Sequence, residues 1–254
     1  MVRDEPQRVD IMGINVDRVN MAQAVEKVVN WLEVGRGSVG KHYVVTVNPE
    51  FIIAAQKDKE FRRILNAADL AVADGVGLRL SGKVTDIVGG IYLLEELCRV
   101  ASERGFTAAF LGGHKNVAKQ AADCLQKKYP GLKVVFAEDG PEINSMGYEV
   151  YSIEEGQKRK PRHTTYSIPN TDLLFVGFGQ IKQEKWIARN LEKLPIKVAM
   201  GVGGSFDEIA GRQIRVPKWG QQAGLKWLIR LIQQPSRFKR QLAIWQFAWK
   251  AIRG

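Results

Sequence analysis

The sequence predicts an α/β fold, in which a mostly parallel sheet has helices on both faces and a basic amphipathic helical segment is appended at the carboxyl end. Apolar runs of strand length alternate with amphipathic stretches of helix length along residues 1–210. Several of the runs are apolar throughout, as in strands buried on both faces of a parallel sheet. Basic residues without acidic partners are concentrated in residues 211–254. We therefore expect a Rossmann-like core at residues 1–210 and an appendage at residues 211–254.

The composition predicts a globular protein of the cytosol. The chain has 254 residues, of which 45% are hydrophobic and 26% charged, enough for a sizeable core. Its two cysteines, Cys98 and Cys124, lie in expected helices, which excludes a disulfide framework and favours a reducing compartment. The three histidines have no ligand-like spacing, so neither a metal site nor a cofactor is expected. The first residues lack an apolar signal segment, and no run approaches about 18 apolar residues, so we expect a soluble or peripheral protein.

The first expected elements are a strand and a helix. The apolar run "RVDIMGINV" at residues 8–16 predicts one strand. The stretch "MAQAVEKVVNWLEVG" has Ala24, Val28 and Leu32 on one face, which predicts an amphipathic helix.

The second strand is expected at "HYVVTVN", residues 42–48. Its last residue, Asn48, is followed by Pro49 and Glu50, which together have the pattern of an N-cap, a first helical residue and a first-turn acid. We expect one helical region from there to Ala67.

Strands and helices continue to alternate along the rest of the core. The further expected strands cover residues 69–74, 106–113, 133–140, 172–179 and 197–204. The further expected helices cover residues 90–105, 114–129, 181–194 and 205–213. Between them, residues 139–170 are polar and irregular, which predicts an exposed loop around "GQKRKPRH".

Five of the expected strands end in small polar or glycine residues that core packing does not require: "TVN", "ADG", "FLGG", "VGFGQ" and "GVGGSFD". Four of these ends are glycine-bearing turns that lead into a helix, whose free backbone N–H groups attract anions. Tight turns alone would explain any one of them. Because ligands bind outside the carboxyl ends of the strands in open α/β sheets, the five together predict a binding site.

The common nucleotide and hydrolase motifs are absent from this sequence. Both "GVGGSF" and "GFGQIK" lack the third glycine of a dinucleotide fingerprint, and there is no P-loop. There is no Asp-x-Asp pair to hold a metal–diphosphate complex and no Gly-x-Ser-x-Gly elbow. The sequence therefore predicts that backbone and basic groups, rather than a metal, contact phosphate.

The end of the chain carries almost all of the net charge. Residues 211–254 contain ten Lys and Arg and no Asp or Glu, which is +10 of the total of +11. Such a block is typical of proteins that bind phosphate in a ligand, a lipid or a nucleic acid. Within it, an apolar stripe recurs at helical spacing: Phe238, Leu242, Trp245, Trp249 and Ile252. The stripe favours a helix at an anionic membrane surface, although a helix packed on the core has the same pattern.

Taken together, these features resemble the WecG/TagA/CpsF glycosyltransferases. The resemblance rests on "TVNPEFIIAA", "ILNAADLAVADGVGL", "FLGG", "LLFVGFGQIKQEKWI" and "GVGGSFDEIAGRQIRVPKWGQQAGLKWLIRLIQQPSRFKRQ", in this order, and covers nearly all of the chain outside residues 139–170. Enzymes of this family transfer a sugar, often N-acetylmannosamine, from UDP to a polyprenyl-diphosphate-linked sugar, with inversion and without a metal. The resemblance implies a UDP-sugar donor, a lipid-linked acceptor and a cytoplasmic enzyme at the inner face of the plasma membrane that serves cell-surface polysaccharide synthesis.

The motifs of the family fall on identifiable positions of this chain. The resemblance implies that Asp74, of the Asp-Gly pair, is the general base that deprotonates the acceptor hydroxyl. Taken alone, the residue has the alternative role of an N-cap before "GVGLRL". The implied substrate contacts are Thr46, Asn48, Gly75, Gln183, Glu184, Gly203, Gly204, Asp207, Arg230, Arg237 and Arg240. Of these, Gln183 is expected to donate to the sugar or the diphosphate, and Asp207 to contact the uracil or ribose.

The chain departs from the family pattern at positions that bear on specificity. Where the family has proline, glutamate, arginine and aspartate, this chain has Ile181, Lys226, Ile87 and Tyr92. The segment after the Asp-Gly pair is also shorter than in the family. Arg79 and Lys83 are candidates to replace the missing arginine near the diphosphate.

Two other classes of function stay open from the residues alone. A nucleotide-dependent oxidoreductase would use the same Rossmann-like sheet. A nucleic-acid-binding protein would use the basic tail, but no recognised motif accompanies that tail, so no nucleic-acid partner is expected. The sequence makes no prediction of the oligomeric state.

Overall fold

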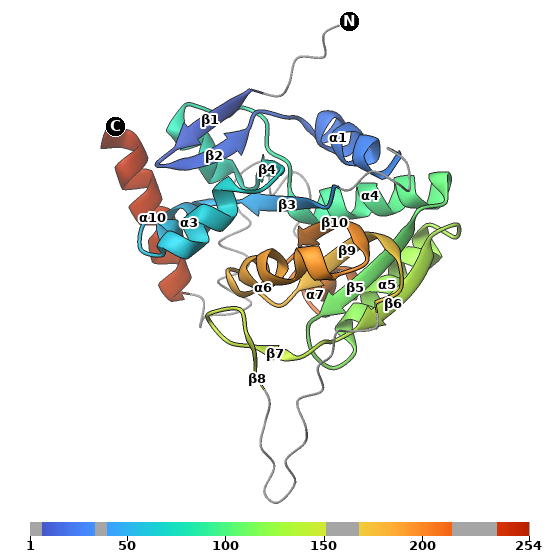
Figure 1. Ribbon diagram of the computed structural model, residues 1–254. Helices are drawn as coiled ribbons and strands as arrows, with labels where there is room; N and C mark the ends of the chain where they lie inside the picture. The colour runs from blue at the N-terminus through green and yellow to red at the C-terminus, as the bar shows by residue number, and fades with distance from the viewer. Residues whose placement is uncertain (1–6, 34–39, 151–167, 215–237, 254) are drawn as a thin grey trace, which may run out of the picture.

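The computed structural model describes residues 7–33, 40–150, 168–214 and 238–253. Its centre is an eight-stranded sheet in the order β1-β2-β4-β3-β10-β9-β5-β6 (Figure 1). The strands are β1 (Arg8–Ile11), β2 (Ile14–Asp17), β3 (His42–Val47), β4 (Leu70–Ala73), β5 (Thr107–Gly112), β6 (Lys133–Glu138), β9 (Thr171–Gly177) and β10 (Ile196–Gly201). The β1–β2 pair is antiparallel and the other pairs are parallel, as the apolar runs predict.

Residues 8–16 form a hairpin, so the prediction of a single strand there was wrong. Met12 and Gly13 have φ values of 53° and 82°, which is the turn geometry that reverses a strand after two residues. The Gly13 N–H donates to Asp10 Oδ1 at 3.1 Å and closes the turn. The apolar pattern continues through the turn because Ile11 and Ile14, on either side of it, are both buried.

The helices cover both faces of the sheet, as expected. One face carries α1 (Met21–Glu33), α4 (Gly90–Arg104), α5 (Val117–Lys128) and the short α7 (Ser205–Ile209). The other carries α2 (Pro49–Ala55), α3 (Lys59–Asn66) and α6 (Lys182–Asn190). Along β3, Val45 and Val47 join the core on one face and Val44 the core on the other, as the two-residue repeat of a strand requires.

The helical region after Asn48 is two helices rather than one. Asn48 caps α2 as predicted, because its Oδ1 accepts from the Phe51 N–H at 2.9 Å and Pro49 is the first helical residue. Asp58 then caps α3, since its Oδ1 accepts from the Phe61 N–H at 2.9 Å. This second cap restarts the chain in a new direction, so α2 and α3 present separate apolar faces to the sheet.

Neighbouring strands at the centre of the sheet send their connections to opposite faces. The chain leaves β3 into α2 on one face, and it leaves the adjacent parallel strand β10 into α7 on the other. In an α/β sheet, this divergence opens a crevice at the carboxyl ends of the strands.

Two elements stand outside this layered core. A small antiparallel hairpin, β7 (Glu142–Ile143) with β8 (Glu149–Val150), lies where the sequence predicts an irregular polar loop. At the end of the chain, α10 (Phe238–Arg253) packs on α2 and on the 3₁₀ helix η1 (Val76–Ser81) (Figure 1). Within the described ranges, no helix is both long and apolar enough to cross a membrane.

The face that α10 turns to the core differs from the predicted stripe. Phe247 is fully buried against the core, whereas Leu242, Trp245 and Trp249 are 46%, 65% and 56% exposed. Part of the predicted stripe is therefore a solvent-facing surface. The side chains of the other two members of the stripe, Phe238 and Ile252, are outside those described.

Candidate active site

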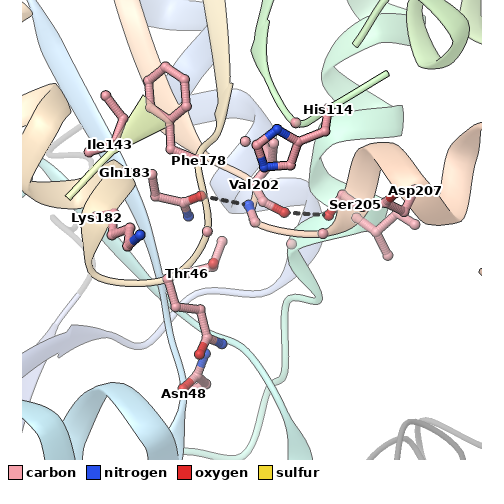
Figure 2. Close-up of a pocket in the computed structure, with 18 of the residues that line it drawn as sticks. Thr46, Asn48, His114, Ile143, Phe178, Lys182, Gln183, Val202, Ser205 and Asp207 are labelled. Atoms are coloured by element: carbon pink, nitrogen blue, oxygen red, sulfur yellow. Dashed lines mark hydrogen bonds between the residues drawn. The ribbon is translucent and has the colours of Figure 1, made fainter. Parts of the chain in front are cut away.

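A cavity of about 620 Å³ lies at the carboxyl edge of the sheet. The ends of β3, β4, β5, β9 and β10 all contribute to its lining, so the five unusual strand ends meet in one place, as predicted. Figure 2 shows side chains from these loops around the cavity. The wall formed after β3 and β4 is called the β3/β4 wall below, and the wall formed after β9 and β10 is called the β9/β10 wall.

Thr46 and Asn48 line the cavity on the β3/β4 wall. Thr46 is largely buried, and a side chain at Gly90, the first residue of α4, would lie 3.1 Å from its Cγ2. Glycine therefore lets α4 begin directly beside Thr46. Asn48 uses its side-chain oxygen as the cap of α2, which leaves its amide nitrogen as a possible donor to a ligand.

Asp74 lines the same wall, directly after β4. Its backbone N–H donates to the Val47 carbonyl oxygen at 2.7 Å, which extends the β3–β4 ladder by one residue. The residue that caps η1 is Gly75, with no side-chain hydrogen bond, so the alternative role of Asp74 as an N-cap is not observed. Within the described part of the chain, the Asp74 carboxylate makes neither a hydrogen bond nor an ion pair, and it is free to meet a ligand.

Gly75 does not line the cavity. Its φ of 92° turns the chain away from β4, a conformation that favours glycine. The structure therefore gives this predicted substrate contact a role in the turn.

The β9/β10 wall contains a buried chain of hydrogen bonds. The Gln183 Oε1 accepts from the Gly203 N–H at 2.9 Å (Figure 2). The Gln183 Nε2 donates to Glu184 Oε1 at 2.7 Å. Glu184 Oε2 accepts from the Ile181 N–H at 2.6 Å. Burial raises the pKa of the Glu184 carboxyl from its ordinary value of 4.5 to about 7, although these hydrogen bonds act in the opposite direction.

The predicted substrate contacts on this wall separate into two groups. Gln183, Gly203, Gly204 and Asp207 line the cavity. Glu184 does not line the cavity. It is only 1% exposed and lies beneath the cavity, where it does not contact a substrate directly. The sequence could not distinguish the two positions, because a polar helix start has the same pattern whether it is solvated or buried.

The three predicted arginines of the tail are not placed at the site. Arg230 and Arg237 lie outside the described residues. The backbone of Arg240 belongs to α10, but its side chain is not among those described.

Three cations that were not among the predicted substrate contacts line the cavity: Lys115, Lys182 and Arg212. The Arg212 guanidinium donates to Gln120 Oε1 and to the His114 carbonyl oxygen, each at 2.9 Å, and to the Lys115 carbonyl oxygen. It thereby ties the segment after α7 to the loop between β5 and α5. Lys182 directly precedes the predicted contacts Gln183 and Glu184, and Arg212 belongs to the basic tail, so both signals were available in the sequence.

The β7–β8 hairpin closes one side of the cavity with Glu142 and Ile143. Arg189 of α6 holds the hairpin in place: its guanidinium lies 4.2 Å from the Tyr148 ring centroid and donates to the Met146 carbonyl oxygen. Because the sequence carries no motif in residues 139–170, it could not predict this part of the site.

The proposed replacements for the missing family arginine lie elsewhere. Arg79 Nε donates to the Thr85 carbonyl oxygen at 2.9 Å, and Lys83 Nζ donates to the Asp10 carbonyl oxygen at 2.7 Å. Neither residue lines the cavity. Ile87, which the resemblance places where the family has arginine, is partly buried and packs against the core.

Across the described residues, no three His, Cys, Asp or Glu side chains are grouped so that they could hold a metal ion. The polar groups that line the cavity are three amides, two hydroxyls, three carboxylates, one imidazole, three cations and the glycine-rich backbone. Such a set can bind a diphosphate with its cations and backbone N–H groups, and it can remove a proton with Asp74.

Known proteins are similar to this chain over nearly its whole length. A family profile described as "Glycosyl transferase WecG/TagA/CpsF family" matches residues 9–254. The chain is 30% identical over 253 residues to the "N-acetylglucosaminyldiphosphoundecaprenol N-acetyl-beta-D-mannosaminyltransferase" of Staphylococcus aureus (strain MRSA252), which covers 98% of this chain and 93% of the relative. It is 29% identical over 226 residues to the protein of the same name from Bacillus subtilis (strain 168), which covers 84% of this chain and 83% of the relative. The family match includes the five loops and α10.

Proposed function

Because this chain belongs to the WecG/TagA/CpsF family of glycosyltransferases, we propose that it moves an N-acetylmannosamine-type sugar from UDP to a polyprenyl-diphosphate-linked N-acetylglucosamine in cell-surface polysaccharide synthesis. One observation supports this proposal most directly. A carboxylate without a protein partner among the described residues, Asp74, faces a cavity whose other sides carry cations and glycine-rich loops. A sugar nucleotide needs these two kinds of groups, one to activate the attacking hydroxyl and one to hold the diphosphate.

The proposed reaction is a single displacement at the anomeric carbon. Asp74 accepts the proton of the acceptor hydroxyl, and the acceptor oxygen forms a bond to the anomeric carbon. The bond from that carbon to the phosphate oxygen breaks on the opposite face, and UDP leaves with the electron pair. The configuration at the anomeric carbon is therefore inverted.

The protein groups assigned to the donor lie on several loops. Thr46 and Asn48 hold hydroxyl or acetamido groups of the sugar from the β3/β4 wall. Lys182 and Arg212, which line the cavity, stabilise the leaving diphosphate, because the negative charge there increases as the bond breaks. Asp207 is assigned to the uracil or ribose.

Calorimetry with UDP and a transfer assay test the proposal together. We expect UDP to bind with and without EDTA, and we expect UDP-N-acetylmannosamine to label a prenyl-diphosphate-linked N-acetylglucosamine. Loss of UDP binding in EDTA would contradict a metal-independent mechanism. Binding of NAD in place of UDP would favour the oxidoreductase alternative, and retention on duplex DNA at physiological salt would favour a nucleic-acid-binding protein.

We propose further that the enzyme reaches its acceptor by docking on an anionic membrane surface at the inner face of the plasma membrane. Trp245 and Trp249 give α10 an exposed aromatic surface, and the basic residues of the tail surround it in the sequence. A helix of this kind binds at the interface, where each basic residue adds about 1 kcal/mol of attraction. Arg230, Arg237 and Arg240 are then assigned to donor or acceptor phosphates at the membrane.

Vesicle sedimentation tests the docking surface. We expect Trp245→Ser with Trp249→Ser to reduce sedimentation with anionic vesicles and transfer to a lipid-linked acceptor, while UDP binding is kept. Gln246→Ser, on the same helix, is the control. Unchanged sedimentation of the double variant would show that these side chains do not dock the enzyme.

A further inference from the structure

Glu184, the buried carboxylate beneath the β9/β10 wall, takes no part in the proposed reaction. We infer that Glu184 is a positioning residue, which fixes the orientation of the Gln183 amide so that a donor N–H faces the cavity and which joins the β9–α6 loop to the β10–α7 loop. The identity of the ligand, a UDP-sugar, rests on the proposed function. The hydrogen bonds that orient Gln183 are independent of that function.

The hydrogen bonds leave only one arrangement of this network. Gly203 presents an N–H to Gln183 Oε1 at 2.9 Å, and the Gln183 Nε2 donates to Glu184 at 2.7 Å. The other Glu184 oxygen accepts from the Ile181 N–H at 2.6 Å. The Gly203 N–H needs an acceptor, so the oxygen of the Gln183 amide faces Gly203 and its nitrogen faces Glu184. The ionised form of Glu184, which only accepts hydrogen bonds, requires the same orientation.

The orientation of the Gln183 amide determines whether its nitrogen or its oxygen faces the cavity. The nitrogen of Gln183 carries two hydrogens, and the bond to Glu184 uses one of them. Among the described residues, the second hydrogen has no acceptor, and Gln183 lines the cavity. A ligand oxygen can accept this hydrogen, whereas a flipped amide would present an oxygen that repels a phosphate.

Tight packing keeps the network in place. Both side chains are almost completely buried, with Gln183 2% and Glu184 1% exposed. A side chain at Gly201 of β10 would lie 2.6 Å from Glu184 Oε1 and 2.8 Å from Gln183 Nε2, so only glycine leaves room for the pair. Ile181 has a φ of 71°, which is strained for a β-branched residue, and its bond to Glu184 holds that conformation.

The neighbouring charged groups do not replace Glu184 in this role. Lys185, the next residue of α6, pairs with Asp58, the cap of α3, at 2.6 Å and with Glu60 of α3 at 3.1 Å. From β3, Tyr43 is buried nearby, and its hydroxyl has no hydrogen-bond partner among the described residues. Burial, followed by the charge of Glu184, raises the pKa of Tyr43 well above its ordinary value, so Tyr43 remains neutral.

The isosteric variant Glu184→Gln tests the inference because it has the same shape but one acceptor oxygen instead of two. The new amide nitrogen at position 184 then lies opposite another donor, either the Ile181 N–H or the Gln183 Nε2. One buried hydrogen bond is therefore lost. We expect the variant to melt at a lower temperature and the KM for the UDP-sugar to rise about tenfold, the equivalent of about 1.4 kcal/mol, with a smaller change in kcat. Glu192→Gln makes the same chemical change on the exposed η2 turn (Leu191–Lys193) and should change neither quantity.

The exchanged pair Gln183→Glu with Glu184→Gln separates positioning from stability. In this double variant, the carboxylate now at position 183 can accept from the Gly203 N–H and from the new amide at position 184. The oxygen of that amide accepts from the Ile181 N–H, so all three hydrogen bonds can form again. We expect the melting temperature to recover but the KM to remain high, because a carboxylate at position 183 then faces the cavity in place of an N–H.

Two results would overturn the inference. One is wild-type melting and KM in Glu184→Gln; the other is recovery of both quantities in the exchanged pair, which would show that the loop connection alone matters. A wild-type protein that neither binds UDP nor transfers sugar would instead contradict the proposed function. In that case, the melting temperatures of the two variants would still test whether Glu184 maintains the network.

Discussion

The two walls of the cavity use their polar groups in opposite ways. On the β9/β10 wall, Gln183 and Glu184 are buried and bonded to each other and to the backbone of both loops. On the β3/β4 wall, Asp74 is partly exposed, and its carboxylate has no bonded partner within the described part of the chain. On the β9/β10 wall, the polar side chains therefore hold the loops together. On the β3/β4 wall, the carboxylate faces the cavity without a bonded partner among the described residues.

This difference predicts which property a substitution changes. A change at Thr46 or Asp74 on the β3/β4 wall removes a group from the reaction and leaves the fold as it is, whereas Asn48 on the same wall also caps α2. A change on the β9/β10 wall removes a group that holds two loops together, so stability and donor binding change together. The predictions below test this distinction.

The largest expected effect belongs to Asp74→Asn. The amide has nearly the same size but cannot accept a proton, so transfer should fall by about two to four orders of magnitude, the usual contribution of a general base. The melting temperature and the affinity for UDP should stay close to those of the wild type. Turnover near the wild-type rate would show that another group takes the proton.

The next effect is a dependence of stability on pH that comes from Glu184. Its folded pKa of about 7 lies above its ordinary value of 4.5, so between these values the folded state holds a proton that the unfolded state has released. This contribution to stability is therefore complete below about pH 4.5, declines as the pH rises to about 7, and is constant above that; the total change is roughly 3 kcal/mol.

Urea unfolding of the wild type and of Glu184→Gln at several pH values measures this contribution. The amide does not titrate, so the difference in the free energy of unfolding between the two proteins should change over the interval from pH 4.5 to pH 7. A difference that is independent of pH would mean that Glu184 does not titrate in this range.

Gly201→Ala should have a smaller effect on the same wall. The added methyl group would meet both Glu184 and Gln183 at less than 3 Å, so the network has to move, with an expected loss of about 1–3 kcal/mol of stability. Gly204→Ala is the control, because a side chain there meets no atom within 4 Å and its φ of −81° suits alanine. Equal melting temperatures of the two variants would contradict the tight packing around Gly201.

Thr46→Val should have the smallest effect. The substitution keeps the shape of the side chain and removes one hydroxyl, so a lost hydrogen bond to the sugar should reduce kcat/KM about tenfold. The free energy of unfolding should stay within about 0.5 kcal/mol of the wild type. A large loss of stability with unchanged kcat/KM would place Thr46 among the structural residues instead.

Much of the fold could be predicted from the sequence because its signals are local. The cap at Asn48 and the apolar run of β3 depend on neighbouring residues, and both are confirmed. The turn at Met12 and Gly13 was missed because the residues on both sides of it are buried, so the apolar pattern has no gap. The second cap at Asp58 was missed because the helical pattern continues on both sides of it.

The site was predictable to the extent that its residues lie at strand ends. Thr46, Asp74 and Gln183 were named from the sequence, and the structure brings them to one cavity. The burial of Glu184 depends on Gly201, which comes from another strand, and the contribution of the β7–β8 hairpin depends on Arg189 of α6. Contacts of this kind leave no periodic pattern in the chain, so sequence reasoning could not find them.

The position of α10 has a mechanical consequence for the β3/β4 wall. This helix rests on α2 and η1, which begin directly after Asn48 and after the Asp74–Gly75 pair. The seven residues of α2 span roughly 10 Å, so a rigid rod of that length connects the surface under α10 to the cap residue at the cavity. A movement of α10 against the body of the protein would therefore act directly on the two elements that begin beside Asn48 and Asp74.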